Sequence, residues 1–514
     1  MLSFIIRRLA STLVVLLVAS FIVYQLTAIS GDPLRDLRAS IDLSAQAKIA
    51  YLTDALNLDV PPILRYFLWL AGAAGFLIGR GDLGISIAKG EAPVIDALAG
   101  AMFSTLQLIT LATVLSIVVG VAVGMTTALR QYSGYDYSVT FFAFVFYSLP
   151  IFWVAVLLKE FGAIRFNRFL EDPVFSTTAI STIALILAVV STGIAGGGLK
   201  TRIRVFLGSL VLSAALLIAM NLSGWLKTPS IGLVGVVLTT AMIAGIALLL
   251  STGFSQKRAV IIVGAMALIA GALWLPGQYL FFYLEGPMGI LAAIAGMAAI
   301  GVGLGFAFGG DGKRDIARTA GIVGGFGGLI LVIDEAMQYW SRYLELIPMQ
   351  TGFVSTIGAV TPTIGRENNM WLSILDSYAH LILPTAALMI ISVAGYTRYA
   401  RASLLEVLNQ DYIRTARAKG LNERTVIVRH AFRNAMIPIA TIIAFDISGL
   451  IGGAIITERV FAWQGMGALF NAGLNAVDVN LVMGFFLVTG LFAVVGNLVA
   501  DLLYTALDPR IRVN

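Results

Sequence analysis

Histidines, cysteines and glycine-rich loops are the residues of this chain from which covalent or nucleotide chemistry could arise. The sequence contains no cysteine and two histidines, His380 and His430, which lie fifty residues apart. Thiolate chemistry and a His- or Cys-ligated metal site are therefore not expected. The nearest approach to a phosphate-binding loop is Gly312-Lys313, where Arg314 stands in place of the required Ser or Thr. We predict that the chain is not an enzyme and holds no cofactor or metal of its own.

A second group of polar residues lies in one basic segment, residues 398–433. Its centre reads Asp-Tyr-Ile-Arg-Thr-Ala-Arg-Ala-Lys-Gly-Leu, residues 411–421, which predicts a helix that breaks at Gly420 and a second helix with Asn422 as its N-cap. Ala416 and Gly420 are four residues apart and share one helix face. A small-residue face flanked by cations suits docking into a cleft on another protein. An ordinary basic loop at a membrane surface explains the same residues, and the pattern alone leaves both interpretations open.

The composition indicates the surroundings in which these residues lie. Of the 514 residues, 59% are hydrophobic and 12% are charged, and the mean hydropathy is +0.92. A soluble domain of this composition would expose too much apolar surface to remain dispersed, so the sequence predicts an integral membrane protein. The net charge of +6 could suggest nucleic acid as a partner, but the positions of the charges do not require one.

Apolar stretches of the length that crosses a bilayer, about 20 residues, recur along the chain. We expect twelve spans, one of which, Thr319–Ile333, is short and glycine-rich. The glycines in these stretches are interpreted as positions of close helix packing. The expected spans are Leu9–Ser30, Ala97–Leu129, Tyr137–Leu158, Pro173–Leu199, Val205–Leu226, Thr228–Gln256, Ala259–Leu284, Gly286–Gly310, Thr319–Ile333, Ser377–Thr397, Asn434–Thr457 and Val479–Ala500.

Lysine and arginine in the connecting loops predict the orientation of these spans. Arg7-Arg8 precedes an apolar run that is longer than a signal-peptide core and lacks a small-x-small cleavage site, so we interpret it as a retained span. With both termini in the cytoplasm, the loops on that side are net basic and the outer loops net acidic, which is the distribution that membrane insertion favours. The basic residues then assigned to the cytoplasmic side are Arg7, Arg8, Arg130, Lys200, Arg202, Arg204, Lys257, Arg258, Lys313, Arg314, Arg318, those between Arg398 and Arg433, Arg510 and Arg512.

Charged residues within or beside the spans are few. Asp446 lies in the middle of one, where an ionised carboxylate is costly unless it is paired or hydrated. It lines the substrate path or forms a hydrogen bond between helices or with a partner subunit, and the sequence does not choose between these interpretations. Lys159, Glu160, Asp334 and Glu335 lie at span ends and are interpreted as interfacial charges.

Segment 411–421 resembles the EAA loop of binding-protein-dependent ABC permeases, in the form used by their dipeptide/oligopeptide/nickel branch. Arg414-Thr415-Ala416 and Gly420 occupy the E-A-A-x-x-x-G positions, with Arg414 replacing the leading Glu, a departure that this branch commonly shares. Pro438 falls on the terminal proline of the motif. In that family the loop forms the coupling helix that sits in a groove of the ATPase subunit. The resemblance therefore implies ATPase coupling by Arg414, Thr415, Ala416, Arg417, Ala418, Lys419, Gly420 and Leu421.

Further landmarks of the same family occur in order along the chain and extend the resemblance to residues 1–162 and about 340–514. They are Ile6-Arg7-Arg8-Leu9, Gly31-Asp32-Pro33, Gly81-Asp82-Leu83-Gly84, Ser148–Trp153, His380–Pro384, Glu458–Gly467 and Asp508–Arg512. The resemblance implies an all-α polytopic membrane fold, in which a six-span type I importer permease core carries an inserted block of about six further spans.

We accordingly expect three parts. Residues 1–162 form the N-terminal part of the permease core, with its first three spans and an outer segment, residues 31–98. Residues 163–335 form the inserted hydrophobic block, which has no counterpart in the family's usual chain. Residues 336–514 complete the core and include the cytoplasmic coupling loop, residues 398–433.

The resemblance also implies a function. It predicts the permease subunit of an ATP-driven importer in a bacterial or archaeal cell (inner) membrane, forming half of a translocation pathway for di- and oligopeptides. The implied partners are a second homologous permease, two ABC ATPase subunits that bind the ATP, an extracytoplasmic substrate-binding protein and the lipid bilayer, with no nucleic acid. Asp446, Phe461 and Trp463 are expected along the substrate path. An ion-coupled secondary transporter, and the same permease role for nickel or sugars, are the open alternatives.

Overall fold

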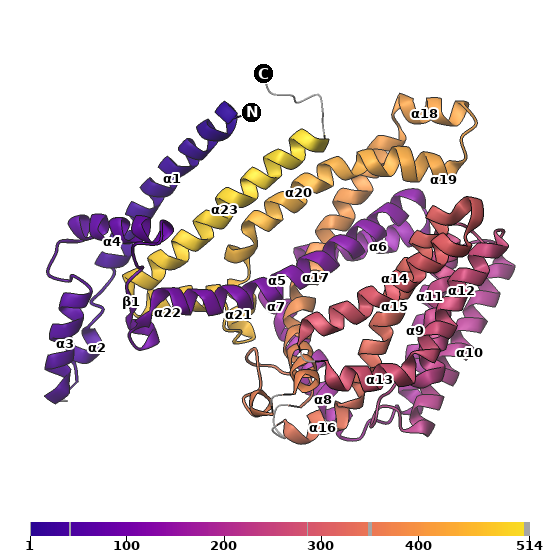
Figure 1. Ribbon diagram of the computed structural model, residues 1–514, viewed down its shortest axis with the longest axis horizontal. Coiled ribbons are helices and arrows are strands. Elements are labelled where there is room, and N and C mark those ends of the chain that lie inside the picture. The colour runs from indigo at the N-terminus through magenta and orange to yellow at the C-terminus, as the bar shows by residue number, and fades with distance from the viewer. Residues whose placement is uncertain (1, 41–42, 285, 348–351, 368, 508–514) are drawn as a thin grey trace. The chain divides into compact units, whose positions relative to one another are not determined.

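The computed structural model describes residues 2–40, 43–284, 286–347, 352–367 and 369–507. Over these residues the regular structure is helical apart from one short β-hairpin (Figure 1). The chain forms two compact units. Unit 1 comprises Met1–Gly162, Thr356–Ala359 and Leu381–Asn514, and unit 2 comprises Ala163–Ser355 and Val360–His380.

Unit 1 contains the two ends of the chain. Helices α1, α20 and α23 lie side by side (Figure 1), and β1 pairs antiparallel with β2, Ile85 opposite Pro93. Its elements are α1 (Leu2–Ile29), α2 (Arg35–Arg38), α3 (Leu43–Ala55), α4 (Pro62–Leu77), β1 (Ile85–Ser86), η1 (Ile87–Lys89), β2 (Ala92–Pro93), α5 (Val94–Leu129), α6 (Gly134–Ser148), α7 (Ile151–Leu157), α18 (Asp411–Ala418), α19 (Glu423–Thr425), η5 (Val426–Ala431), α20 (Phe432–Gly453), α21 (Ile455–Val460), α22 (Met466–Asn475) and α23 (Val479–Leu507).

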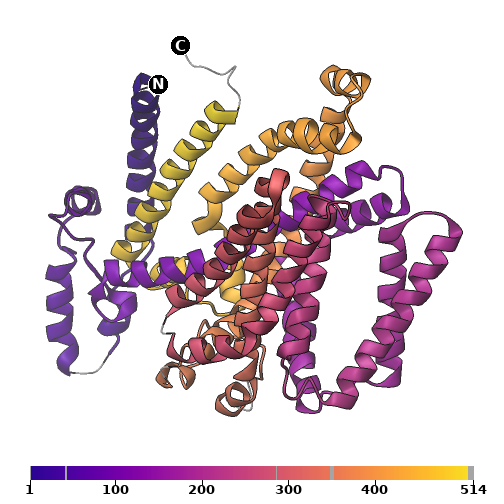
Figure 2. The same cartoon turned by 45° about the vertical axis from the view of Figure 1, so that its right-hand side comes forward.

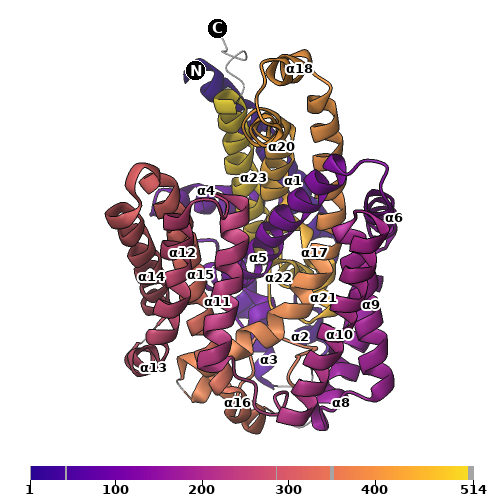
Figure 3. The same ribbon diagram turned by 90° about the vertical axis from the view of Figure 1, so that its right-hand side faces the viewer.

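Unit 2 contains the middle of the chain. Helices α11, α12, α14 and α15 pack as a bundle (Figure 3), and α9 and α10 form an antiparallel hairpin (Figure 2). Its elements are α8 (Arg165–Glu171), α9 (Thr177–Ala195), α10 (Leu199–Ser223), α11 (Gly232–Leu250), α12 (Lys257–Ala272), α13 (Trp274–Tyr283), α14 (Pro287–Phe308), η3 (Gly310–Gly312), α15 (Lys313–Gln338), α16 (Trp340–Leu346) and η4 (Ile364–Arg366), while η2 (Leu158–Ile164) and α17 (Met370–Leu408) run across the boundary between the units.

The predicted spans correspond to apolar helices. Ten helices of the described chain are long and apolar enough to cross a membrane, or twelve when two bent helix pairs are each counted as one span. The all-α polytopic membrane fold is thereby confirmed. The short predicted span at Thr319–Ile333 is the central part of α15, which continues on both sides of it.

Two predicted spans are not straight. The span expected at Tyr137–Leu158 is broken between α6 and α7, where the following helical stretch turns by 104°. Pro150 lacks the backbone N–H that would continue α6, and Leu149 before it is extended, as residues that precede proline tend to be. The span expected at Ala259–Leu284 is bent by 57° between α12 and α13.

Glycine allows α14 and α15 to pack closely. A Cβ atom at Gly301 would collide with the carbonyl group of Ala320, and one at Gly305 would collide with the backbone of Ala317. Gly324 and Gly328 of α15 face Met297 and the backbone of Ile294 in the same way. These are small-xxx-small pairs, which allow helix backbones to approach each other in membranes. The interpretation of these glycines as packing positions is confirmed.

The interpretation of Asp334 and Glu335 as interfacial charges is wrong, because both are buried, at 1% and 6% exposure. Asp334 accepts hydrogen bonds from the backbone N–H groups of Ile231 (2.7 Å) and Gly232 (2.9 Å) at the start of α11. It also accepts one from Trp274 Nε1 at 2.6 Å. Its carboxylate therefore satisfies a helix N-terminus that is distant in sequence, an arrangement that hydropathy does not reveal.

Candidate coupling segment and substrate path

Helix α18 has one buried and one exposed face. Ile413 is fully buried and Ala416 is 8% exposed, and both belong to an apolar cluster that includes Leu404 and Val426. The exposed residues of the predicted coupling set are Arg414, Thr415, Arg417, Ala418, Lys419, Gly420 and Leu421. Ala416 therefore packs against its own chain in this structure, and the surface that α18 presents is basic.

The turn after α18 depends on a glycine and on two side chains. Gly420 has a φ of +76°, a conformation in which residues with a Cβ are strained, and its N–H donates to the carbonyl of Arg417 at 2.9 Å. The Asn422 side chain accepts a hydrogen bond from Thr425 N–H at 2.8 Å and caps α19. The predicted helix, break and second helix with Asn422 as N-cap are confirmed.

An ion pair closes this turn. Arg417 Nη2 donates to Glu423 Oε1 at 2.7 Å and its Nε donates to Oε2 at 3.2 Å. These hydrogen bonds lower the pKa of the Glu423 carboxyl below its usual value. Both side chains are well exposed, so the pair orients the turn and contributes little to global stability.

The segment is fastened to the helices from which it projects. Ser403 Oγ of α17 donates to the carbonyl of Ala435 in α20 at 2.7 Å. Asn434 Nδ2 donates to the Tyr412 hydroxyl at 2.9 Å. Figure 1 shows α18 beyond the neighbouring ends of α17 and α20.

An ion pair with a buried carboxylate joins α17 to α6. Arg401 Nε donates to Asp136 Oδ1 at 2.8 Å and Nη2 donates to Oδ2 at 3.0 Å, which is the bidentate geometry. Asp136 is 2% exposed and also accepts the backbone N–H of Tyr132 at 3.0 Å. Because an unpaired buried carboxylate is costly, Asp136 requires Arg401. The sequence analysis did not identify this pair, whose members are 265 residues apart.

Asp446 is an exposed carboxylate on α20. The hydroxyl of Tyr396, on α17, donates a hydrogen bond to Asp446 Oδ2 at 2.5 Å. Exposed on the protein surface and paired on one side, Asp446 keeps oxygen lone pairs free for a second donor. Both interpretations from the sequence, a path residue and a helix–helix hydrogen bond, remain compatible with this geometry.

Between α21 and α22 the chain turns around the buried carboxylate of Glu458, which is 0% exposed. Glu458 Oε1 accepts from Thr105 Oγ1 of α5 at 2.8 Å, and Oε2 accepts from Ala468 N–H at 3.0 Å. Thr105 Oγ1 in turn accepts from Met466 N–H at 2.7 Å. A Cβ atom at Gly465 would collide with both the Glu458 carboxylate and Thr105 Oγ1, so glycine is required there.

Phe461 and Trp463 are each 1% exposed. Trp463 Nε1 donates to the carbonyl of Ser104 at 3.2 Å, and its ring packs with Leu108. Lys159 Nζ donates to the carbonyl of Val460 at 3.0 Å and lies 5.8 Å from the centre of the Phe461 ring. In this conformation the two aromatic residues hold the loop in place and do not line open space.

The structure thus gathers the predicted coupling residues on α18 and the turn that follows it, and separates them from Asp446 and the aromatic pair. Among the described residues, no group of three or more His, Asp or Glu side chains is arranged to hold a metal ion. The landmark Asp508–Arg512 lies outside the described residues. Glu458 occurs within a landmark motif, but nothing in the local sequence distinguishes it from an exposed loop acid.

Comparison with known sequences finds a transport family that resembles the C-terminal part of the chain. Residues 329–513 match the family described as "Binding-protein-dependent transport system inner membrane component". This part of the chain is similar to that family, and the chain is a multi-pass membrane protein. The match does not include residues 1–162, for which the resemblance stays a prediction.

Individual relatives belong to peptide transport systems. The chain is 41% identical over 150 residues to the oligopeptide transport system permease protein OppB of Mycobacterium tuberculosis, covering 29% of this chain and 46% of the relative. It is 45% identical over 152 residues to the permease protein AppB of Bacillus subtilis (29% and 48%). It is 43% identical over 162 residues to the dipeptide transport system permease protein DppB of Escherichia coli (32% and 46%). The matched region thus spans about half the length of these relatives.

Proposed function

We propose that the chain is the transmembrane permease subunit of an ATP-driven importer for short peptides. The observation that carries the proposal is α18, an exposed basic helix at the position of the EAA-like motif, which a hydrogen bond between Tyr412 and Asn434 joins to α20. The names of the relatives, which refer to oligopeptide and dipeptide transport, support the substrate class. The chain provides positioning and movement, and the energy comes from ATP bound by other subunits.

In this proposal both termini and α18 face the cytoplasm, where α18 docks into a groove on an ATPase subunit. The docking surface consists of the exposed residues Arg414, Thr415, Arg417, Ala418, Lys419, Gly420 and Leu421, with Ala416 supporting them from beneath. A second permease completes the pathway, and an extracytoplasmic binding protein delivers the peptide to the outer face. Asp446 is the proposed contact for the amino group of the peptide, because its carboxylate is exposed and accepts hydrogen bonds.

The experiment that tests the proposal is purification of the tagged chain in mild detergent with mass spectrometry of the bound proteins. We expect an ATPase and a second permease to be recovered. Arg414→Glu together with Lys419→Glu should release the ATPase and abolish ATP-dependent peptide uptake in proteoliposomes, because both side chains are exposed and the fold does not need them. Lys200→Glu, an exposed cation at the start of α10, is the matched control and should retain the ATPase.

Uptake that continues without ATP, driven by a proton or sodium gradient, would instead establish an ion-coupled secondary transporter. If the ATPase were recovered with the Arg414→Glu, Lys419→Glu variant as well as with the control, α18 would not be the docking site. Uptake of nickel or sugars in place of peptides would keep the permease role and change only its substrate.

A further inference from the structure

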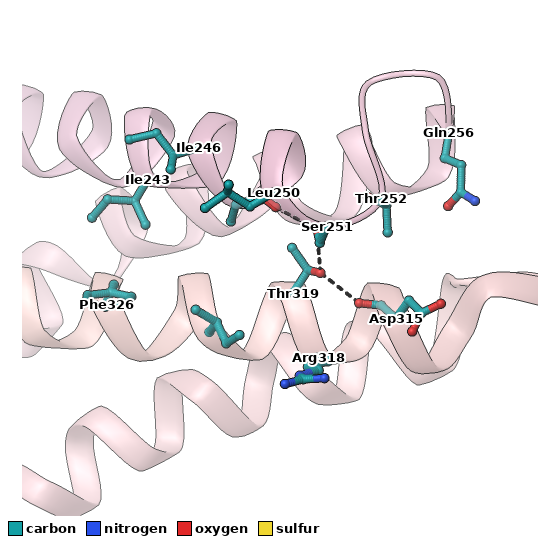
Figure 4. A pocket seen from close by; sticks show the side chains of 12 residues that line it. Ile243, Ile246, Leu250, Ser251, Thr252, Gln256, Asp315, Arg318, Thr319 and Phe326 are labelled. Atoms are coloured by element: carbon teal, nitrogen blue, oxygen red, sulfur yellow. Dashed lines mark hydrogen bonds between the residues drawn. The ribbon is translucent and has the colours of Figure 1, made fainter. Parts of the chain in front are cut away.

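Unit 2 contains a groove between α11 and α15 that the proposed transport mechanism does not use. Its volume is about 740 Å³, within the range of about 300–1,000 Å³ that is typical of ligand sites. Figure 4 shows the two helices on opposite sides of it, with side chains from each directed into the space between them. Every lining residue belongs to the middle block of the chain, for which the family comparison offers no function.

The lining changes from polar to apolar along the groove. Arg318, Asp315 and Gln256 lie at one end, where α11 has ended and α15 begins. Ile246 and Phe326 lie towards the other end. Asp315 and Phe326 are eleven residues apart on one helix, or about 16 Å at 1.5 Å per residue. That length is close to half of the hydrocarbon core, which is about 30 Å thick. The groove thus has the polarity and the length of one leaflet.

The polar end has free hydrogen-bonding capacity. Thr319 Oγ1 lies 2.9 Å from Ser251 Oγ and 2.8 Å from the carbonyl oxygen of Asp315. The Thr319 hydroxyl in the groove therefore already has hydrogen-bond partners. The exposed side chains of Arg318 and Asp315 form no ion pair with any described residue.

The charge at this end favours an anion. Lys257, Arg258, Lys313 and Arg314 lie at the same helix ends as Arg318, against the acids Asp311 and Asp315. The guanidinium of Arg258 lies against Gly310, just before α15, which brings the two sets of basic residues together. Basic pockets at the ends of membrane helices attract lipid phosphates.

We propose that this groove is a binding site for one phospholipid. The phosphate lies against Arg318 at the polar end, and one acyl chain follows Ile246 and Phe326. Asp315 favours a headgroup that also carries an amine, since a carboxylate at the mouth repels a second negative charge and pairs with an ammonium group. The inserted block thereby holds a structural lipid. This proposal is independent of the peptide importer, because it needs only that the polar end lies at a membrane surface.

The test is native mass spectrometry of the full-length protein, delipidated in detergent and titrated with phosphatidylethanolamine. We expect one tightly retained phospholipid. Arg318→Gln should weaken its binding about fivefold, the effect expected for one basic residue at a lipid headgroup. Ile246→Trp should abolish it by filling the apolar part of the groove.

Two matched controls lie away from the groove. Lys200→Gln removes an exposed cation at the start of α10 that does not line it. Leu238→Trp adds a ring at a site on α11 that is 60% exposed, compared with 57% for Ile246. Both should bind lipid like the unmodified protein. Thermal unfolding in the same detergent verifies that each variant is folded.

Several results would overturn the proposal. If diacylglycerol with the same acyl chains were retained equally well, the phosphate headgroup would not contribute to binding. Displacement of the lipid by inorganic phosphate at equal concentration would identify a phosphate site in its place. Unchanged binding in Arg318→Gln or Ile246→Trp, or equal losses in the control variants, would show that the retained lipid is only part of the surrounding shell.

Discussion

At the scale of single residues, the carboxylates of this chain have different roles that their positions in the sequence do not reveal. Asp334 and Glu458 are buried and satisfied by donors from other helices. Asp446 is exposed and bonded to Tyr396 alone among the described residues. The first two therefore stabilise the fold, and Asp446 is the one of the three that we propose as a substrate contact.

Glu458→Gln should destabilise the folded protein by about 1–3 kcal/mol, the cost of leaving a buried donor unsatisfied. The amide that replaces one carboxylate oxygen would point an N–H group at the backbone N–H of Ala468 or at Thr105. Denaturant or thermal unfolding in detergent measures the change. Glu171→Gln, at an exposed position, should leave the stability unchanged. A loss of equal size in both variants would contradict the role given to the Glu458 cluster.

Asp446→Asn should lower peptide uptake about tenfold, since a hydrogen bond to a charged group contributes about 1.5 kcal/mol or more. Tyr396→Phe removes only the tyrosine hydroxyl that donates to Asp446, and it should leave uptake within about twofold. Initial rates in proteoliposomes measure both effects. If the two variants lost uptake equally, Asp446 would be a helix-packing residue and not part of the path.

At the scale of elements, glycine positions decide how α14 and α15 pack. Gly301 and Gly305 of α14 touch the backbone of α15, whereas Gly303 between them faces open space. The same residue type therefore has opposite importance within five residues of one helix. Sequence alone indicates that the stretch is glycine-rich but does not say which of its glycines face another helix.

Gly305→Val should destabilise the protein by about 1–3 kcal/mol or more, because the added carbons overlap the backbone of Ala317. Gly303→Val, with open space around its Cβ, should change stability by less than about 0.5 kcal/mol. Thermal unfolding of the two variants in one detergent provides the comparison. Similar melting temperatures for both would mean that α14 and α15 do not pack at these glycines.

At the scale of the whole molecule, the basic loops predict which ends of the helices face the cytoplasm. The chain has no cysteine, so single-cysteine variants can report orientation without a background. Lys200→Cys, exposed at the start of α10 and assigned to the cytoplasmic side, should react with a membrane-impermeant maleimide only when the cytoplasmic face is open. Asp54→Cys, exposed in the segment expected outside, should react in intact cells. The reverse labelling pattern would show that the protein has the opposite orientation in the membrane.

The sequence by itself determined the membrane class, the position of nearly every span and the break of the coupling segment at Gly420. These features depend on local properties: runs of apolar residues, glycine conformation and N-capping by Asn422. It did not locate the bend at Pro150, because the apolar run continues through it. The tertiary structure alone decided that Ala416, Phe461 and Trp463 are buried and that Asp334 caps α11. It also paired Asp136 with Arg401 and formed the groove between α11 and α15. The physical reason is that burial and charge pairing depend on elements that are far apart in the chain and meet only when it folds.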